Sequence, residues 1–238
     1  MTNEPPKFTH KNSSLGISQA LENDQPKKLR RSTTLLSDSF KEPSEHDTCF
    51  GWAGFYMTLY LNKIAVNIFG GVTGWKWYNR IDELVILGAL PTPTQIKEMQ
   101  QQQNLKTVVN LCAEFPGYRG LYQELNIQQM RLGTADYTVP TLDKIEVGVS
   151  AIMDIAEHRD GSIYIHCKAG RGRSAALGLC YLIRRYELNP QQAQSVLIKA
   201  RAQVDKELYH AEQIRMYYKS IIMEAEGGRI HRIPYTFM

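Results

Sequence analysis

The chain has 238 residues, of which 28 are lysine or arginine and 24 are aspartate or glutamate, giving a formal net charge of +4. This length holds one domain with additional segments, and so mild a charge argues against nucleic-acid binding. The four cysteines show neither a paired spacing nor a neighbouring His/Cys cluster, so we expect no metal site and no structural disulfide.

The first 76 residues divide into two segments of different composition. Residues 1–48 are polar and lack an apolar period, which predicts a disordered tail, and their interspersed acidic side chains are atypical of a mitochondrial presequence. Residues 49–76 are apolar and aromatic, but neither side of Lys63 reaches the roughly twenty residues that span a bilayer. We interpret 49–76 as a membrane-interfacial anchor, with a helix packed against the next domain as the alternative.

Residues 77–224 alternate short aliphatic runs with longer helical patterns, which is typical of an α/β domain. The predicted strands are 84–90, 107–111, 128–132 and 162–166. The predicted helices are 94–103, a run after Tyr118, 142–157, 174–186, 190–201 and 206–223. This order predicts a central, mostly parallel sheet flanked by helices, with the site at the carboxyl ends of the strands. Residues 225–238 form a basic and aromatic tail that either touches a membrane or frays.

Residues 163–175 are the most informative stretch. A β-branched apolar run leads into His166 and Cys167, a basic loop with two glycines follows, and Ser174 opens a helix-forming segment. A strand, a tight loop and a helix N-terminus together form a site for a phosphate-sized anion. The same field favours a thiolate at Cys167, and Arg173 can fold back to bind two phosphate oxygens. We therefore expect phosphate-ester hydrolysis through a phosphocysteine, with a buried structural cysteine as the alternative.

The order His166, Cys167, five residues, Arg173 and Ser174 resembles the signature of cysteine-based phosphatases of the tyrosine-phosphatase and dual-specificity type. By this resemblance Cys167 attacks phosphorus, Arg173 holds the equatorial oxygens and Ser174 helps the thiolate to leave. His166 then orients the loop and carries no proton, and no cofactor is needed. The residues expected around the phosphate are Lys168, Ala169, Gly170, Arg171 and Gly172.

A thiolate nucleophile needs a separate acid to protonate the leaving oxygen. The family supplies an aspartate about thirty residues before the cysteine, and Asp136 lies at that distance. The alternative for Asp136 is an ordinary turn or cap residue. Asp143 competes for the role, but its position in the first turn of a predicted helix is explained by the helix dipole.

Two further cations in the loop bear on the substrate. Lys168 and Arg171 add positive charge to a pocket that already holds Arg173. A phospholipid headgroup or an anionic bilayer surface would benefit from that charge more than a single phosphotyrosine would. The loop also resembles those of lipid-directed members of the superfamily, so we expect an anionic phospholipid substrate, with a generic solvated loop as the alternative.

Segments outside the loop extend the resemblance. Residues 77–91, 110–115, 131–136 and 140–142 are similar, in this order and spacing, to the mitochondrial PTP-like phosphatases that act on phosphatidylglycerophosphate. The chain departs from the best-known animal members at Gly172, where they carry serine, and the run 114–120 is closer to plant or protist relatives.

The resemblance implies a phosphatidylglycerophosphate phosphatase of the cardiolipin pathway that is associated with the mitochondrial inner membrane. One alternative is a phosphoinositide phosphatase or a dual-specificity protein phosphatase with the same chemistry. A second is a phosphate-binding adaptor with little catalysis, and a cytoplasmic or other membrane-associated location also stays open.

Overall fold

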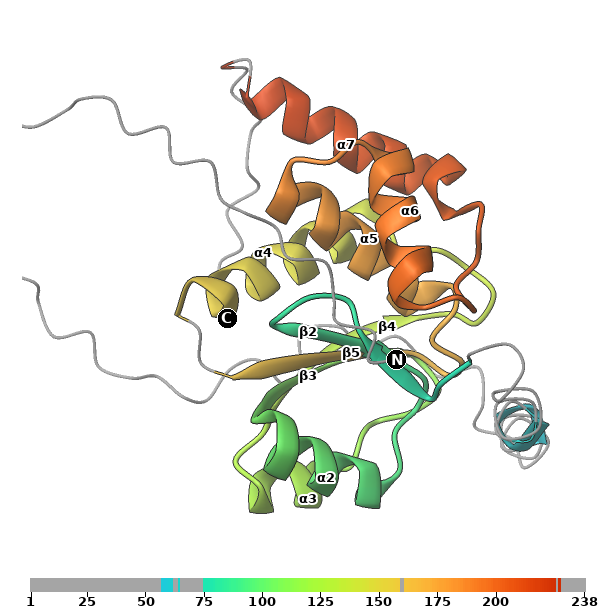
Figure 1. Ribbon diagram of the computed structural model, residues 1–238, viewed down its shortest axis with the longest axis vertical. Coiled ribbons are helices and arrows are strands. Elements are labelled where there is room, and N and C mark those ends of the chain that lie inside the picture. Colours follow the sequence, from blue (N-terminus) through green and yellow to red (C-terminus); the bar gives the residue numbers. More distant parts are fainter. Residues whose placement is uncertain (1–56, 62–63, 65–74, 159–160, 226, 228–238) are drawn as a thin grey trace, which may run out of the picture.

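Figure 1 shows the computed structural model of the chain, which describes residues 57–61, 64, 75–158, 161–225 and 227. The predicted tail 1–48, most of the segment 49–76 and the residues 228–238 lie outside this part. The interpretation of these segments therefore stays a prediction.

Five strands form one central sheet in the order β1-β2-β5-β3-β4. Their bounds are β1 (Tyr78–Arg80), β2 (Val85–Gly88), β3 (Leu105–Cys112), β4 (Gln128–Thr134) and β5 (Ser162–His166). β1 runs antiparallel to β2, whereas β2 with β5, β5 with β3 and β3 with β4 are parallel pairs. The predicted, mostly parallel sheet is confirmed. Sequence reasoning missed β1, because this three-residue, half-buried edge strand is too short to show an apolar period.

Helices cover both faces of the sheet, as Figure 1 shows. On one face lie α2 (Pro93–Gln103) and α3 (Arg119–Glu124), and on the other lie α4 (Leu142–His158), α5 (Arg173–Tyr186), α6 (Pro190–Ala200) and α7 (Glu212–Ala225). The predicted start of α6 is confirmed, since Asn189 caps the helix by accepting the Gln192 N–H at 2.9 Å.

The single helix predicted over 206–223 is wrong. A 3-10 turn (Leu208–His210) and α7 take its place, with Ala211 extended between them at φ −59° and ψ 136°. Leu208 is buried in the core, and the chain turns there before α7 begins. Burial of this one side chain overrides the helical pattern, which continues through the break in the sequence.

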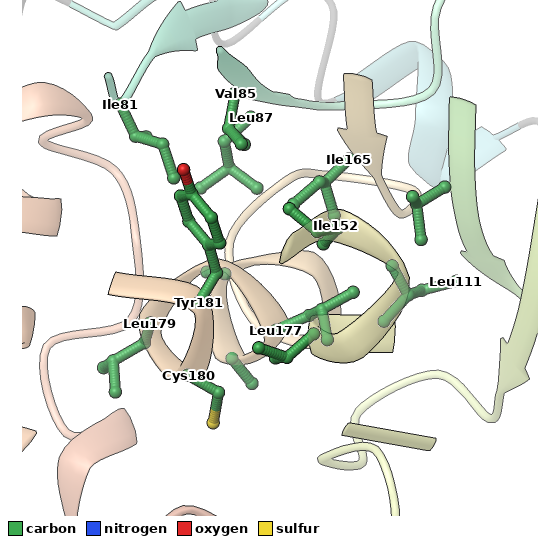
Figure 2. Packing of buried hydrophobic residues seen from close by; sticks show 14 of the residues in the cluster. Ile81, Val85, Leu87, Leu111, Ile152, Ile165, Leu177, Leu179, Cys180 and Tyr181 are labelled. Atoms are coloured by element: carbon green, nitrogen blue, oxygen red, sulfur yellow. The ribbon is translucent and has the colours of Figure 1, made fainter. Parts of the chain in front are cut away.

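The central strand β5 is buried on both faces. Ile163 and Ile165 pack into the larger core cluster beneath α4 and α5, where Figure 2 shows Ile165 near Ile152 and Leu177. Tyr164 points to the opposite face and packs in the smaller cluster beneath α2 and α3. A strand covered on both faces has a continuous apolar sequence, and this explains the uninterrupted run before His166.

A buried carboxylate ties α5 to the start of the sheet. Asp82 is 5% exposed and accepts hydrogen bonds from the backbone N–H groups of Leu84 and Val85 and from the hydroxyl groups of Tyr181 and Tyr186. Burial, together with the nearby Asp82 charge, raises the pKa of Tyr181, so its hydroxyl remains a donor. These bonds fix the helix whose first residue is Arg173.

Residues 57–61 form a short helical segment ahead of the domain. Its apolar residues Met57, Tyr60 and Leu61 are exposed, and Leu59 packs against the larger core cluster. None of the helices in the described part is long and apolar enough to cross a bilayer.

Candidate active site

Three parallel strands bring the candidate site together at their carboxyl ends. Cys167 follows β5, Glu114 lies two residues beyond the end of β3, and Asp136 lies two residues beyond the end of β4. The loop 167–172 then leads into α5, which begins at Arg173. Because neighbouring parallel strands end at the same edge of a sheet, residues far apart in the sequence converge on the helix N-terminus.

The Cys167 side chain is surrounded by hydrogen-bond donors. Its Sγ atom accepts a hydrogen bond from the Gly170 N–H at 3.3 Å and from the Ser174 hydroxyl at 3.2 Å. Burial alone raises the pKa of this thiol, but the Arg173 charge and the hydrogen bonds from Ser174 and Gly170 outweigh it, and the pKa is lowered overall. The geometry therefore favours the thiolate.

Arg173 is a buried guanidinium whose donors are shared among three partners. It forms a two-bond pair with Glu114, in which both N···O distances are 2.8 Å, and one nitrogen also donates to the Thr134 carbonyl at 2.9 Å. The other nitrogen lies 2.8 Å from an oxygen of Asp136. Burial alone lowers the pKa of Arg173, yet the Glu114 hydrogen bonds and the charge of Cys167 raise it overall, so the side chain stays protonated.

Asp136 bridges two cations of the site. One carboxylate oxygen faces Arg173, and the other lies 3.4 Å from the Lys168 ammonium group. The Asp136 side chain is 30% exposed, whereas that of Arg173 is 3% exposed, so the carboxylate lies on the solvent side of the guanidinium. The competing candidate Asp143 lies in the first turn of α4, as the sequence predicts.

His166 is enclosed by aromatic rings. It stacks on Tyr164 with ring centroids 5.7 Å apart and meets the edge of Phe115 at 6.5 Å, while its Nδ1 atom lies 3.4 Å from the Cys167 carbonyl oxygen. Burial lowers the pKa of His166 to about 3, so the ring is neutral at physiological pH. This environment suits a packing and orienting role better than proton transfer.

A buried arginine binds backbone carbonyl groups of the loop 167–172. Arg201 is 1% exposed and donates to the carbonyl groups of Gly170 at 2.8 Å and Ala169 at 3.3 Å. Gly170 has φ +67°, and a Cβ at this position would collide with the Gly88 backbone. Burial lowers the pKa of Arg201 to about 10, which still leaves it charged near neutral pH.

The two remaining predicted residues lie where the loop joins α5. Gly172 is the N-cap of that helix and offers no side chain to the first helical N–H groups. Arg171 is exposed, and its Nε atom donates to the Gln203 carbonyl at 3.0 Å while its guanidinium lies 5.4 Å from the Trp75 ring centre. The two predicted loop cations thus differ in their contacts. Lys168 pairs with Asp136, which in turn pairs with Arg173, whereas the Arg171 guanidinium contacts Trp75 and Gln203.

Sequence reasoning missed Glu114 and Arg201 as parts of the site. Glu114 carries a recognisable signal, since it is an acidic residue directly after a buried strand at the functional edge of a parallel sheet. Arg201 carries none, because a basic residue at the end of an amphipathic helix normally faces water. Within the described residues no group of three or more His, Cys, Asp or Glu side chains could hold a metal ion.

Comparison with known proteins identifies the domain. The model for "Dual specificity phosphatase, catalytic domain" matches residues 85–220, which is more than half of the chain. The chain is 29% identical over 183 residues to the "Phosphatidylglycerophosphatase and protein-tyrosine phosphatase 1" of Homo sapiens and 30% identical over 183 residues to that of Mus musculus. These matches cover 73% of this chain and 90% and 94% of the two relatives.

The solved structures agree with the sequence comparison. The crystal structure of PTPMT1 in complex with PI(5)P is 29% identical to this chain and superposes with a TM-score of 0.57, covering 63% of this chain and 99% of the crystallised chain. The predicted fold class is therefore confirmed. The chain belongs to the dual-specificity phosphatase catalytic-domain family and is a phosphatase.

Proposed function

We propose that this phosphatase hydrolyses phosphatidylglycerophosphate to phosphatidylglycerol through a phosphocysteine on Cys167. The observation that carries the chemistry is the Cys167 sulfur, which accepts bonds from Ser174 and Gly170 next to the protonated Arg173. The relatives support a lipid substrate, because both mammalian proteins are named phosphatidylglycerophosphatases and PTPMT1 has been crystallised in complex with PI(5)P.

In the first step the Cys167 thiolate attacks phosphorus, and the bond from phosphorus to the glycerol oxygen breaks. Arg173 binds the equatorial phosphate oxygens with the nitrogen that contacts Asp136 in the free enzyme. The phosphate thus competes with the Asp136 carboxylate for this nitrogen, and Asp136 becomes free to face the leaving oxygen. The displaced carboxylate takes up a proton from solvent and gives it to that oxygen, which then departs as a neutral alcohol.

In the second step water attacks the phosphocysteine and releases inorganic phosphate. Asp136, now a carboxylate, accepts the proton of the attacking water. The bond between sulfur and phosphorus breaks, and the departing thiolate accepts a hydrogen bond from the Ser174 hydroxyl, whose oxygen lies 3.2 Å from sulfur in the free enzyme. Asp136 releases this proton to solvent as its ion pair with Arg173 forms again, and the enzyme returns to its starting state with no cofactor.

The environment of Lys168 favours a phospholipid over a protein substrate. Its ammonium group lies 3.4 Å from Asp136, at the solvent side of Arg173, where the rest of the substrate must lie. A second anionic group on the substrate, such as the phosphodiester of a phospholipid, can bind there. An adaptor role has less support, since a binding site has no need of a cysteine poised as a thiolate.

We also propose where in the cell the enzyme acts and how its chain is divided into domains. A membrane-embedded substrate requires action at a bilayer surface, and we propose the mitochondrial inner membrane on the basis of the resemblance to mitochondrial PTP-like phosphatases. We place the phosphatase domain at residues 77–224, consistent with β1 beginning at Tyr78 and α7 ending at Ala225. The segment 49–76 is proposed as its interfacial anchor.

A substrate panel tests the function directly. We expect kcat/KM on phosphatidylglycerophosphate vesicles to exceed that on a phosphotyrosine peptide by about tenfold or more, because Lys168 favours a substrate with a second anionic group. We also expect it to exceed kcat/KM on phosphoinositides, in line with the names of the mammalian relatives. Cys167→Ser abolishes turnover of every substrate, whereas Cys180→Ala, which alters a buried core thiol on α5, retains it. Comparable rates on peptide and lipid would contradict the lipid assignment, and residual turnover in Cys167→Ser would contradict the mechanism.

The acid is tested by varying the leaving group. Asp136→Asn lowers kcat on an alkyl phosphate about a hundredfold or more, because an alkoxide departs poorly without a proton. The loss is much smaller on p-nitrophenyl phosphate, whose phenolate departs without help. Asp143→Asn, the matched change at the competing aspartate, leaves both rates near wild type. Full alkyl-phosphatase activity in Asp136→Asn would remove Asp136 from the acid role.

The state of the thiol is tested by alkylation. The rate of iodoacetamide modification of Cys167, followed by peptide mass spectrometry, rises with pH at a midpoint below that of an ordinary thiol, because the lowered pKa populates the thiolate. Ser174→Ala removes a donor to the thiolate, so the midpoint shifts upward by roughly one pH unit. A midpoint that stays in place, or moves to lower pH, would show that the hydroxyl does not stabilise the thiolate.

A further inference from the structure

Tyr137 stands out on the loop that carries Asp136. This residue is 93% exposed, more than any other large apolar or aromatic residue in the described part of the chain. It also has φ +61°, in the left-handed region that bulky residues rarely adopt. The three other described non-glycine residues with positive φ, Asn104, Asn126 and Glu187, each follow a helix, where this conformation is common.

Two hydrogen bonds within the loop stabilise this conformation. The Tyr137 N–H donates to the Asp136 carboxylate at 3.1 Å, and the Thr138 hydroxyl donates to the Ala135 carbonyl at 2.9 Å. The same carboxylate oxygen of Asp136 contacts Arg173. The backbone that fixes the candidate acid therefore also directs an aromatic ring into solvent, at a cost in both conformational strain and exposed apolar area.

Tyr137 lies beside the entrance to a recessed nucleophile. Cys167 is only 3% exposed, so the phosphate must enter the site while the rest of the substrate stays outside. Asp136, immediately before Tyr137, is the more exposed partner in its ion pair with Arg173. The same entrance carries Lys168, and the loop 167–172 adds a second cation, the exposed Arg171, whose guanidinium lies over the Trp75 ring.

We propose that Tyr137 inserts into the interfacial region of an anionic bilayer and brings the entrance of the site against the lipid surface. A lipid phosphate extends only a short way from the membrane, so a buried nucleophile reaches it only if the rim of the site touches the headgroups. Tyrosine suits that layer, since its ring is apolar and its hydroxyl is polar, and Lys168 and Arg171 complement the lipid charge. The inference rests on the proposed lipid substrate and assigns its recognition surface.

The test separates membrane contact from chemistry. Tyr137→Asn removes the ring, and asparagine tolerates positive φ, so the backbone beside Asp136 is retained. Met216→Asn, at an exposed apolar side chain of α7, is the matched control. Full-length proteins are compared in co-sedimentation with phosphatidylcholine/phosphatidylglycerol vesicles, which contain no phosphate monoester. They are also compared by the ratio of activity on vesicular phosphatidylglycerophosphate to activity on p-nitrophenyl phosphate.

We expect Tyr137→Asn to weaken vesicle binding and to lower the activity ratio about five- to tenfold, with Tyr137→Phe and Met216→Asn close to wild type. Vesicle binding and an activity ratio equal to wild type in Tyr137→Asn would overturn the proposal. An equal loss on both substrates, with vesicle binding unchanged, would also overturn it and would assign Tyr137 to loop geometry. Because the vesicles hold no substrate, vesicle binding tests Tyr137 even if phosphatidylglycerophosphate proves not to be hydrolysed.

Discussion

The buried pair of Arg173 and Glu114 is the constraint on which the rest of the site depends. A guanidinium that is 3% exposed must be neutralised by a partner, because an uncompensated buried charge is strongly destabilising. Glu114 fills two of its donor positions from the end of β3, and Thr134 fills another from the end of β4. These bonds together lock two strand ends to the first residue of α5. One of the two nitrogens that bind Glu114 also contacts Asp136, where a phosphate can take the place of the carboxylate.

The phosphate loop is stabilised on its other side by a different arginine. Arg201 donates hydrogen bonds to the carbonyl groups of Ala169 and Gly170. Because the C=O and N–H of a trans peptide point in opposite directions, the N–H groups of the same peptide units point away from Arg201. With the Gly170 N–H on the Cys167 sulfur, the loop is held in the shape that favours the thiolate before any substrate arrives. The site is thus preorganised, and binding requires mainly the exchange of Asp136 for a phosphate at Arg173.

The sequence was most informative where structure is local. The strand 162–166 has the predicted bounds, and the helix after it begins one residue before its predicted start. The sequence predicts both elements well because an apolar strand, a glycine-containing loop and a helix-forming run are adjacent in the chain. Glu114 and Arg201 were missed because their roles arise from contacts across 59 and 31 residues, respectively. The break before α7 was missed for a related reason, since burial of Leu208 depends on neighbours that the local pattern does not contain.

The covalent intermediate tests the central claim most directly. Full-length wild type and Ser174→Ala are mixed with phosphatidylglycerophosphate vesicles, quenched within a single turnover and analysed by peptide mass spectrometry. We expect a phosphoryl group on Cys167, which accumulates further in Ser174→Ala because the departing thiolate loses its hydrogen-bond donor. Turnover of the lipid with no phosphoryl group on Cys167 at any time, or with the group on another residue, would contradict it.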